Sequence, residues 1–219
     1  PTYYNPVARE KWSPSSLLLP GSDRSYDTDV DRRVRGTAGG DRLESSVPPS
    51  VLVASLPCVN ILFNSVVSSD AFFGTVDLTD FYLESPLAQP QFIKIHTNLF
   101  SPEVLSRLSL LPFLKQDKAG KKFILFRIDK TMYGLKEAGK LSNLRLVSLL
   151  ASFDFHQTLT PGLFRHASRP ITFVLVVDDF GVKYHHPSDF AFLVSCLSTL
   201  YHVKAHPIAS SFLGFSLAD

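Results

Sequence analysis

Three aspartates stand where apolar stretches of the sequence end. Asp178 and Asp179 directly follow the apolar run Phe173–Val177, and Asp77 follows Thr75-Val76. Two adjacent carboxylates at the end of a buried strand repel each other and are costly to remove from water, and a divalent cation relieves both costs. If the strands are neighbours, the three carboxylates offer oxygen ligands that suit Mg²⁺. Two such ions form the clamp used for in-line phosphoryl transfer.

Each of these acids also has a simpler interpretation when it is taken alone. A single aspartate at a strand end commonly closes a turn, and an Asp-Asp pair is commonly the solvated tip of a hairpin. The order and context of the other motifs must therefore decide between the two interpretations.

The elements that would position the acids follow from hydrophobic periodicity. Apolar residues recur at helical spacing in 59–67, in 137–151 and after His186-Pro187, and a further short helix is expected over 102–111. Strands are predicted at 72–78, 91–96, 122–129, 171–177, 180–184 and 211–217. The run broken by Asp178-Asp179 predicts a hairpin with two acids at its tip. Helices and strands alternate irregularly, which favours an α+β fold with an antiparallel sheet over a parallel, doubly wound one.

The amino-acid composition limits which classes of protein this chain can belong to. The 219 residues include 45% apolar and 19% charged residues, enough for a folded core in one domain or in two lobes of one. The apolar runs are too short to span a bilayer, and no secretory signal is visible. Cys58 and Cys196 lie far apart, which favours a reducing compartment over a disulfide scaffold. Because the first residue is Pro1, we expect a piece of a longer chain.

Positive charge is concentrated in one part of the chain. Residues 115–145 hold nine basic and three acidic residues, whereas the whole chain has a net charge of +2. Such a stretch suits a phosphate backbone, although a solvated loop and helix face would also carry it. Residues 1–50 are rich in Pro, Ser, Gly, Arg and Asp and are predicted to be mostly irregular, with a short hairpin around Val34.

Four segments, in this order, resemble motifs of reverse transcriptases. Thr75–Leu83 resembles their first catalytic motif, and Met132–Gly139 resembles the Tyr-Gly-Leu-Lys-Gln-Ala motif of copia-like LTR retrotransposons. Phe173–Phe180 resembles the catalytic Tyr-Val-Asp-Asp hairpin, and Ser211–Gly214 resembles the Phe-Leu-Gly strand that grips the primer terminus. An ordered set of this kind is far more specific than an isolated Asp-Asp pair.

The resemblance implies an α+β right-hand polymerase with fingers and palm, in which helices flank an antiparallel palm sheet and the thumb is absent or truncated. It implies an irregular N-terminal segment over 1–31. The fingers would comprise about 32–72 and 91–130, and the palm about 73–90 and 131–219.

The resemblance also implies an activity, namely an RNA-directed DNA polymerase domain of a retrotransposon polyprotein. It would add dNTPs to a primer on an RNA or DNA template, with two Mg²⁺ ions for which Mn²⁺ can substitute. The expected partners are template, primer and the RNase H and integrase of the polyprotein, with no membrane. The expected location is cytoplasmic virus-like particles and the nucleus.

Site residues carry over from the matching motifs. Asp77, Asp178 and Asp179 would be catalytic metal ligands, with Leu78 a further residue of the metal site. Tyr82 would lie under the sugar of the incoming nucleotide and exclude a 2′-hydroxyl, although a core aromatic is the alternative. The other expected contacts are Arg33, Arg35, Phe81, Gly134 and Lys136 with the nucleotide, and Lys140, Phe212, Leu213 and Gly214 with nucleic acid. Lys204 is a candidate acid for protonating pyrophosphate, with a solvated helix-end lysine as the alternative.

Two departures from the family pattern concern primer positioning, at Val176, and efficiency and fidelity, at Glu137. Glu137 and the missing thumb favour an alternative function, whereas the three intact acids argue against it. Val176 stands where many relatives have Tyr or Phe, and Glu137 stands where copia-like elements carry Gln. The alternative is a catalytically weak or inactive nucleic-acid-binding remnant of a retrotransposon. A metal-dependent nuclease would fit the carboxylates but not the Tyr-Gly-Leu-Lys segment.

Overall fold

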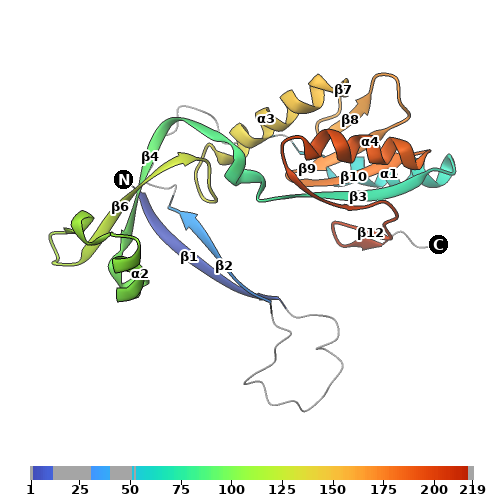
Figure 1. Cartoon of the computed structure of the whole chain (residues 1–219). Coiled ribbons are helices and arrows are strands. Elements are labelled where there is room, and N and C mark those ends of the chain that lie inside the picture. The colour runs from blue at the N-terminus through green and yellow to red at the C-terminus, as the bar shows by residue number, and fades with distance from the viewer. Residues whose placement is uncertain (1, 12–30, 40–50, 52, 217–219) are drawn as a thin grey trace, which may run out of the picture. The chain divides into compact units, whose positions relative to one another are not determined.

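The computed structural model describes residues 2–11, 31–39, 51 and 53–216 (Figure 1). The chain divides into two compact units, and each consists of two separate stretches of sequence. The first unit comprises Pro1–Glu44 and Leu87–Lys136, and the second comprises Ser45–Pro86 and Glu137–Asp219. The described residues form a mixed α/β structure with largely antiparallel sheets and four α-helices.

The first unit is built on a five-stranded sheet with the order β2-β1-β4-β6-β5. Its strands are β1 (Thr2–Lys11), β2 (Asp31–Ala38), β4 (Pro86–His96), β5 (Lys115–Gln116) and β6 (Lys122–Lys130). The pair β1–β2 is antiparallel, with Ala8 opposite Val34, whereas β1 meets β4 in parallel over two residues. Between β4 and β5 lie the short helix α2 (Pro102–Arg107) and the 3₁₀ turns η4 (Thr97–Leu99) and η5 (Leu111–Phe113).

The second unit is built on a six-stranded antiparallel sheet with the order β11-β3-β10-β9-β8-β7. Its strands are β3 (Phe72–Thr79), β7 (Phe155–Gln157), β8 (Leu163–His166), β9 (Thr172–Val176), β10 (Asp179–Tyr184) and β11 (His202–His206). A separate two-stranded hairpin follows, formed by β12 (Ser211–Phe212) and β13 (Phe215–Ser216). This unit has the antiparallel sheet and flanking helices of the expected α+β class.

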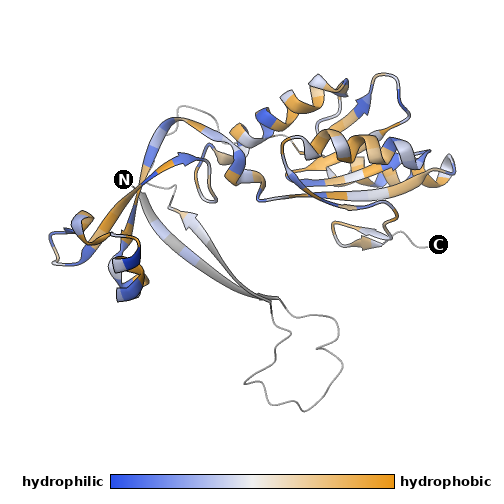
Figure 2. Cartoon of the chain, viewed as in Figure 1, coloured by the Kyte–Doolittle hydropathy of each residue, from blue (hydrophilic) through white to orange (hydrophobic). Residues whose placement is uncertain are grey.

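Helices cover both faces of the six-stranded sheet. On one face, α3 (Ala138–Ser152) and α4 (Pro187–Ser198) bury Leu146, Leu150, Leu193 and Leu197 against the sheet. On the other face, α1 (Leu56–Ser68) packs its Val59, Leu62 and Val66 with strand residues and Phe212. Figure 2 shows hydrophobic residues on α3, on α4 and on the strands of the sheet. The alternation of side chains along each strand supplies both apolar faces, so the sheet is the centre of two hydrophobic clusters.

The structure differs from the sequence-based expectations at several elements. A strand occupies Thr2–Lys11, where irregular chain was expected, because it pairs with β2 further along the chain. Helix α1 and the neighbouring described residues group with the six-stranded sheet in the second unit, because the apolar face of α1 packs on that sheet. The predicted helix over 102–111 ends at Arg107, since Ser109 has a left-handed φ of 51°.

The predicted strand over 211–217 is a tight hairpin. Leu213 and Gly214, the two turn residues, have φ values of 52° and 82°. Two consecutive positive φ values between paired strands are typical of a type I′ turn, which matches the twist of a hairpin. Phe212 therefore lies opposite Phe215, and not in one continuous strand with it.

Two of the composition-based expectations concern membranes and disulfides. Cys58 and Cys196 are both buried free thiols, in the two different hydrophobic clusters. In the described part of the chain, no helix has the length and apolar character that crossing a membrane would require.

Gly74 of β3 lies where the backbone of a neighbouring segment approaches closely. A Cβ at this position would lie 2.9 Å from the carbonyl oxygens of His206 and Pro207 and 2.6 Å from the ring of Phe190. We expect Gly74→Ala to lower the free energy of unfolding by about 1–3 kcal/mol, because backbone atoms cannot move aside as a side chain can. Urea denaturation would measure the change.

The matched control is the same substitution at Gly139, near the start of α3. A Cβ there would meet nothing within 4 Å. Gly139→Ala should therefore raise the free energy of unfolding by up to about 1 kcal/mol, as alanine does in a helix. Equal effects of the two substitutions would contradict the packing described at Gly74.

Candidate active site

The pairing of β3 with β10 brings the three predicted acids together. Asp179 lies directly opposite Asp77 in the antiparallel register. The backbone nitrogen of Leu78 donates a hydrogen bond of 3.2 Å to the carbonyl oxygen of Asp178. All three aspartates therefore lie at one end of the six-stranded sheet. The side chain of Leu78 is buried and has no ligand atom, so only its backbone could contact a metal.

A strained two-residue turn holds Asp178. The turn consists of Val177 and Asp178, between the paired residues Val176 and Asp179. Val177 has a φ of 62°, a left-handed conformation that is rare for a β-branched residue, and a conformation of this kind costs about 1–3 kcal/mol. A positive φ at the first of two turn residues is typical of a type II′ turn. The ladder on both sides of the turn sustains this strain.

The electrostatics of the cluster are visible at Asp179. This side chain is half-buried, and its pKa is raised from 3.8 to about 6. Removal from water is the largest cause, followed by repulsion from Asp178 and then from Asp77. A bound cation would offset the repulsion among the three carboxylates and favour the ionised form of Asp179.

The donor set suits Mg²⁺, which prefers oxygen ligands, keeps several waters and therefore needs few protein ligands. In the described residues, however, no three His, Cys, Asp or Glu side chains are gathered closely enough to hold a metal ion between them as they stand. The carboxylates are thus coupled electrostatically without forming a ready-made cage, and a bound ion would require their side chains to converge further.

Strand β11 adds two side chains to the same face of the sheet. Lys204 lies directly opposite Asp77, and His206 lies opposite Thr75. Residues that are directly opposite in a ladder share one face, so Asp77 has a carboxylate residue on one side and a lysine on the other. Lys204 is exposed and lies in a strand, not at the helix end that its alternative interpretation assumed.

A pocket of about 230 Å³ opens beside the acids. It lies between the six-stranded sheet and the β12–β13 hairpin, and its lining residues are Thr75, Val76, Asp77, Asp179, His206, Ser211, Phe212 and Leu213. Phe212 is buried, with its ring edge-on to Phe73 at a centroid distance of 6.1 Å. Gly181 makes room for that ring, since a Cβ there would lie 2.9 Å from it. Phe212 thus anchors the hairpin, whereas Leu213 and Gly214 are exposed at its tip.

The 3₁₀ turn η3 (Phe81–Glu84) carries the two predicted nucleotide contacts that follow β3. Phe81 is buried, and its ring lies 5.9 Å from that of Tyr201 and 5.4 Å from that of Tyr82. Tyr82 is half-buried at the edge of the core. Because Asp77 and Tyr82 are linked by so few residues, the packing of Phe81 holds Tyr82 close to the end of β3.

A buried hydrogen bond fixes the residue after η3. The hydroxyl of Ser85 donates to the hydroxyl of Ser142 on α3 over 3.1 Å, and both side chains are at most 1% exposed. The hydroxyl of Tyr201 is buried as well and has no hydrogen-bond partner among the described atoms. The support beneath Tyr82 therefore includes aromatic packing and a polar connection from Ser85 to α3.

Of the other residues predicted to contact nucleotide or nucleic acid, Arg33, Arg35, Gly134 and Lys136 lie in the first unit. Lys140 lies in the first turn of α3, in the second unit. Arg33 and Arg35 are on β2, opposite Arg9 and Val7. The end of β2 is joined to the Tyr-Gly-Leu-Lys segment by a 2.7 Å hydrogen bond from the Ala38 nitrogen to the Tyr133 carbonyl oxygen.

Gly134 is required for this close approach. It has a φ of 90°, and a Cβ on it would run into the carbonyl oxygen of Ala38. The first unit thereby brings the strand of Arg33 and Arg35 beside Gly134, with Lys136 exposed two residues later.

Sequence reasoning missed His206 and did not predict β11. A signal was present, because His202, Lys204 and His206 alternate with Val203 and Ala205, and this period of two is typical of a half-buried strand.

The departure at Val176 is accommodated, since its side chain packs partly buried against the cluster under α1.

Comparison with known proteins gives a distant structural likeness. No protein-family model matches the chain, and no curated protein matches it. A crystal structure of prototype foamy virus protease-reverse transcriptase, a selenomethionine-labelled CSH mutant, has a TM-score of 0.41 and 13% sequence identity. The match covers 97% of this chain and 22% of that one, so the chain spans about a fifth of its length. A likeness at this level is weak and decides neither fold nor activity.

The raised pKa of Asp179 predicts a pH-dependent effect of removing its charge. Since the folded state holds this proton up to about pH 6 and the unfolded state releases it near 3.8, the wild-type chain loses stability as pH rises between these values. Asp179→Asn should therefore be more stable than wild type above pH 6, by about 1 kcal/mol after allowance for solvent screening. The difference should vanish near pH 4, at the unfolded-state value.

Urea denaturation between about pH 4 and about pH 8 would measure this difference. Asp70→Asn, which removes the same charge at an exposed site outside the cluster, is the control against which the pH dependence of Asp179→Asn is compared. A pH-independent effect of Asp179→Asn would contradict the repulsion described among the three acids.

Proposed function

We propose that this chain is the RNA-directed DNA polymerase domain of a copia-like retrotransposon polyprotein, with the first unit as fingers and the second as palm. The observation that carries the proposal is the register of β10 on β3, which places Asp179 opposite Asp77, with Asp178 in the turn before β10. The four ordered sequence motifs support it, because residues of three of them fall at this sheet end, at η3 and at the β12–β13 hairpin.

The acids would act through metal ions in this proposal. Asp77, Asp178 and Asp179 would hold two Mg²⁺ ions, for which Mn²⁺ could substitute, with the backbone of Leu78 nearby. When bound, the ions would activate the primer 3′-hydroxyl and stabilise the departing pyrophosphate. The raised pKa of Asp179 supports a cation site, because a cation favours the ionised form that the neighbouring acids disfavour.

The other residues would bind the nucleotide and the nucleic acid. Tyr82 would lie against the sugar, with the backbone of Phe81 beside the triphosphate. Arg33 and Arg35 would contact the triphosphate through charge-assisted hydrogen bonds, with Gly134 and Lys136 lining the same region. Lys140 would meet a phosphate. Phe212, Leu213 and Gly214 would position the primer terminus, which fits a hairpin anchored by a buried phenylalanine beside the pocket at the acids.

The proposed surroundings follow from the same assignment. The substrates would be dNTPs and a primer on an RNA or DNA template. The partners would be the RNase H and integrase of the polyprotein, in cytoplasmic virus-like particles and in the nucleus.

One observation favours a second candidate function, a catalytically weak or inactive nucleic-acid-binding remnant. Among the described residues, no three acidic, imidazole or thiol side chains form a ready-made metal cage. The departure at Glu137 points the same way. In this case the basic residues would still bind nucleic acid, but the acids would not support catalysis.

Primer extension separates the two candidates. On poly(rA)/oligo(dT) with Mg²⁺ or Mn²⁺, we expect slow extension by the wild-type chain and a loss of at least about 100-fold in Asp178→Asn, because one metal ligand is removed. Asp129→Asn, an exposed ion-paired aspartate in the first unit, is the control and should extend as wild type does. Binding of primer-template without extension would instead support the remnant.

The role of Tyr82 predicts a change in sugar selectivity. Tyr82→Val should reduce the preference for dNTP over rNTP by about tenfold or more, because the ring that meets the 2′-hydroxyl is gone. Tyr82→Phe keeps the ring and is the matched control. The measurement is kcat/KM for single-nucleotide incorporation of dTTP and UTP. Unchanged selectivity in Tyr82→Val would assign this side chain to the core alone.

A further inference from the structure

The first unit contains a second pocket, of about 470 Å³, which the proposed chemistry does not use. It lies where η4 passes the start of β6, and its lining residues are His96, Thr97, Asn98, Leu99, Lys121 and Lys122. Two lysines and a histidine line it, and no acid does. A pocket with this lining offers hydrogen-bond donors and positive charge to an anion.

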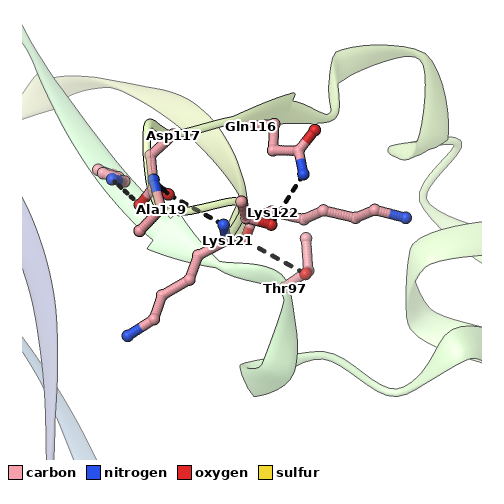
Figure 3. Close-up of polar contacts among 8 residues, drawn as sticks. Thr97, Gln116, Asp117, Ala119, Lys121 and Lys122 are labelled. Atoms are coloured by element: carbon pink, nitrogen blue, oxygen red, sulfur yellow. Dashed lines mark hydrogen bonds and ion pairs between the residues drawn. The ribbon is translucent and has the colours of Figure 1, made fainter.

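The nearby carboxylate of Asp117 is already occupied (Figure 3). Its Oδ1 accepts hydrogen bonds from the backbone nitrogens of Ala119, at 3.0 Å, and Lys121, at 2.9 Å. Its Oδ2 accepts from the Nζ of Lys94 at 3.1 Å. The bond from Lys121 and then that from Lys94 lower the pKa of Asp117. Asp117 therefore shapes the turn between β5 and β6, and its charge is balanced by Lys94.

The ammonium groups of Lys121 and Lys122 remain available. Neither makes an ion pair or a side-chain hydrogen bond within the described part of the chain. Lys122 contributes only its backbone, whose carbonyl oxygen accepts a 3.3 Å hydrogen bond from the hydroxyl of Thr97. This bond fixes η4 against the start of β6 and so maintains the wall of the pocket.

The directions of the two lysines indicate the shape of the ligand. Figure 3 shows the side chains of Lys121 and Lys122 leaving the hairpin in different directions. Two ammonium groups that diverge in this way suit an extended polyanion, which can place one phosphate at each lysine. The exposed Leu99 in the lining offers an apolar surface to the parts between the phosphates.

We infer that the pocket at Lys121 and Lys122 in the first unit binds the phosphate backbone of a single-stranded nucleic acid, through residues that include none of the three acids. The choice of nucleic acid over another polyanion rests on the proposed function. The physical basis is the release of counterions from phosphates, which makes such binding depend strongly on salt.

The test is the binding of a fluorescein-labelled oligo(dT) of about 20 nucleotides to the full chain, measured by anisotropy without Mg²⁺ or dNTP. Lys121→Gln/Lys122→Gln should bind about tenfold more weakly than wild type. The slope of log K against log salt concentration should fall by about 1.4, from about 0.7 for each lost single-strand contact. Both side chains are exposed and unpaired among the described residues, so the variant should fold, which circular dichroism would check.

The matched control is Lys115→Gln/Lys118→Gln, which removes the same charge from the same hairpin outside the pocket. Its affinity should change by less than about threefold. Equal losses in the two variants would overturn the inference in favour of a diffuse basic surface. Competition by inorganic phosphate as effective as that by unlabelled oligonucleotide would overturn the extended ligand, and equal competition by polyglutamate would overturn nucleic acid.

The outcome is separable from that of the polymerase proposal. If primer extension fails while Lys121→Gln/Lys122→Gln still loses affinity selectively, the polymerase proposal falls and the binding site stands.

Discussion

The pairing of β3 with β10 is the constraint on which the candidate site depends. It sets Asp179 opposite Asp77 and brings Leu78 against the turn that holds Asp178. A shift of this register by one residue would send the carboxylates to the opposite face, into the cluster under α3 and α4. The apolar residues that alternate with the acids, Val76 and Phe180, resist such a shift because both are buried in that cluster.

Packing on the two faces of the sheet serves different parts of the site. The cluster under α3 and α4 includes Phe81 and so supports the turn that carries Tyr82. The cluster under α1 includes Phe212 and so holds the β12–β13 hairpin beside the acids. Two unfavourable features lie at the end of the sheet that both clusters support. They are the left-handed backbone of Val177 and the raised pKa of the Asp179 carboxyl group. Strain and uncompensated charge at one location are common at functional sites.

Much of the second unit could be predicted from sequence because its signals are local. The apolar run before Asp178 and its continuation at Phe180 predict a hairpin without knowledge of any distant residue. The elements that were missed depend on other information. Strand β1 forms by pairing with β2, which lies further along the chain. The hairpin at Leu213 depends on a positive φ, which cannot be predicted from the presence of a leucine. Whether the acids bind metal depends on side-chain convergence, which spacing along the chain does not specify.

The division of the chain has a consequence for how it can be cut. Each unit draws on two stretches of sequence, so neither can be expressed as one continuous fragment. A fragment that begins after residue 44 would lack β1 and β2, and β4 would lose the neighbour it meets at Ile93 and Lys94. The exposed edge of β4 would then be open to pairing with other molecules. Self-association of such a fragment would reflect the missing strands and would say nothing about the oligomeric state of the intact chain.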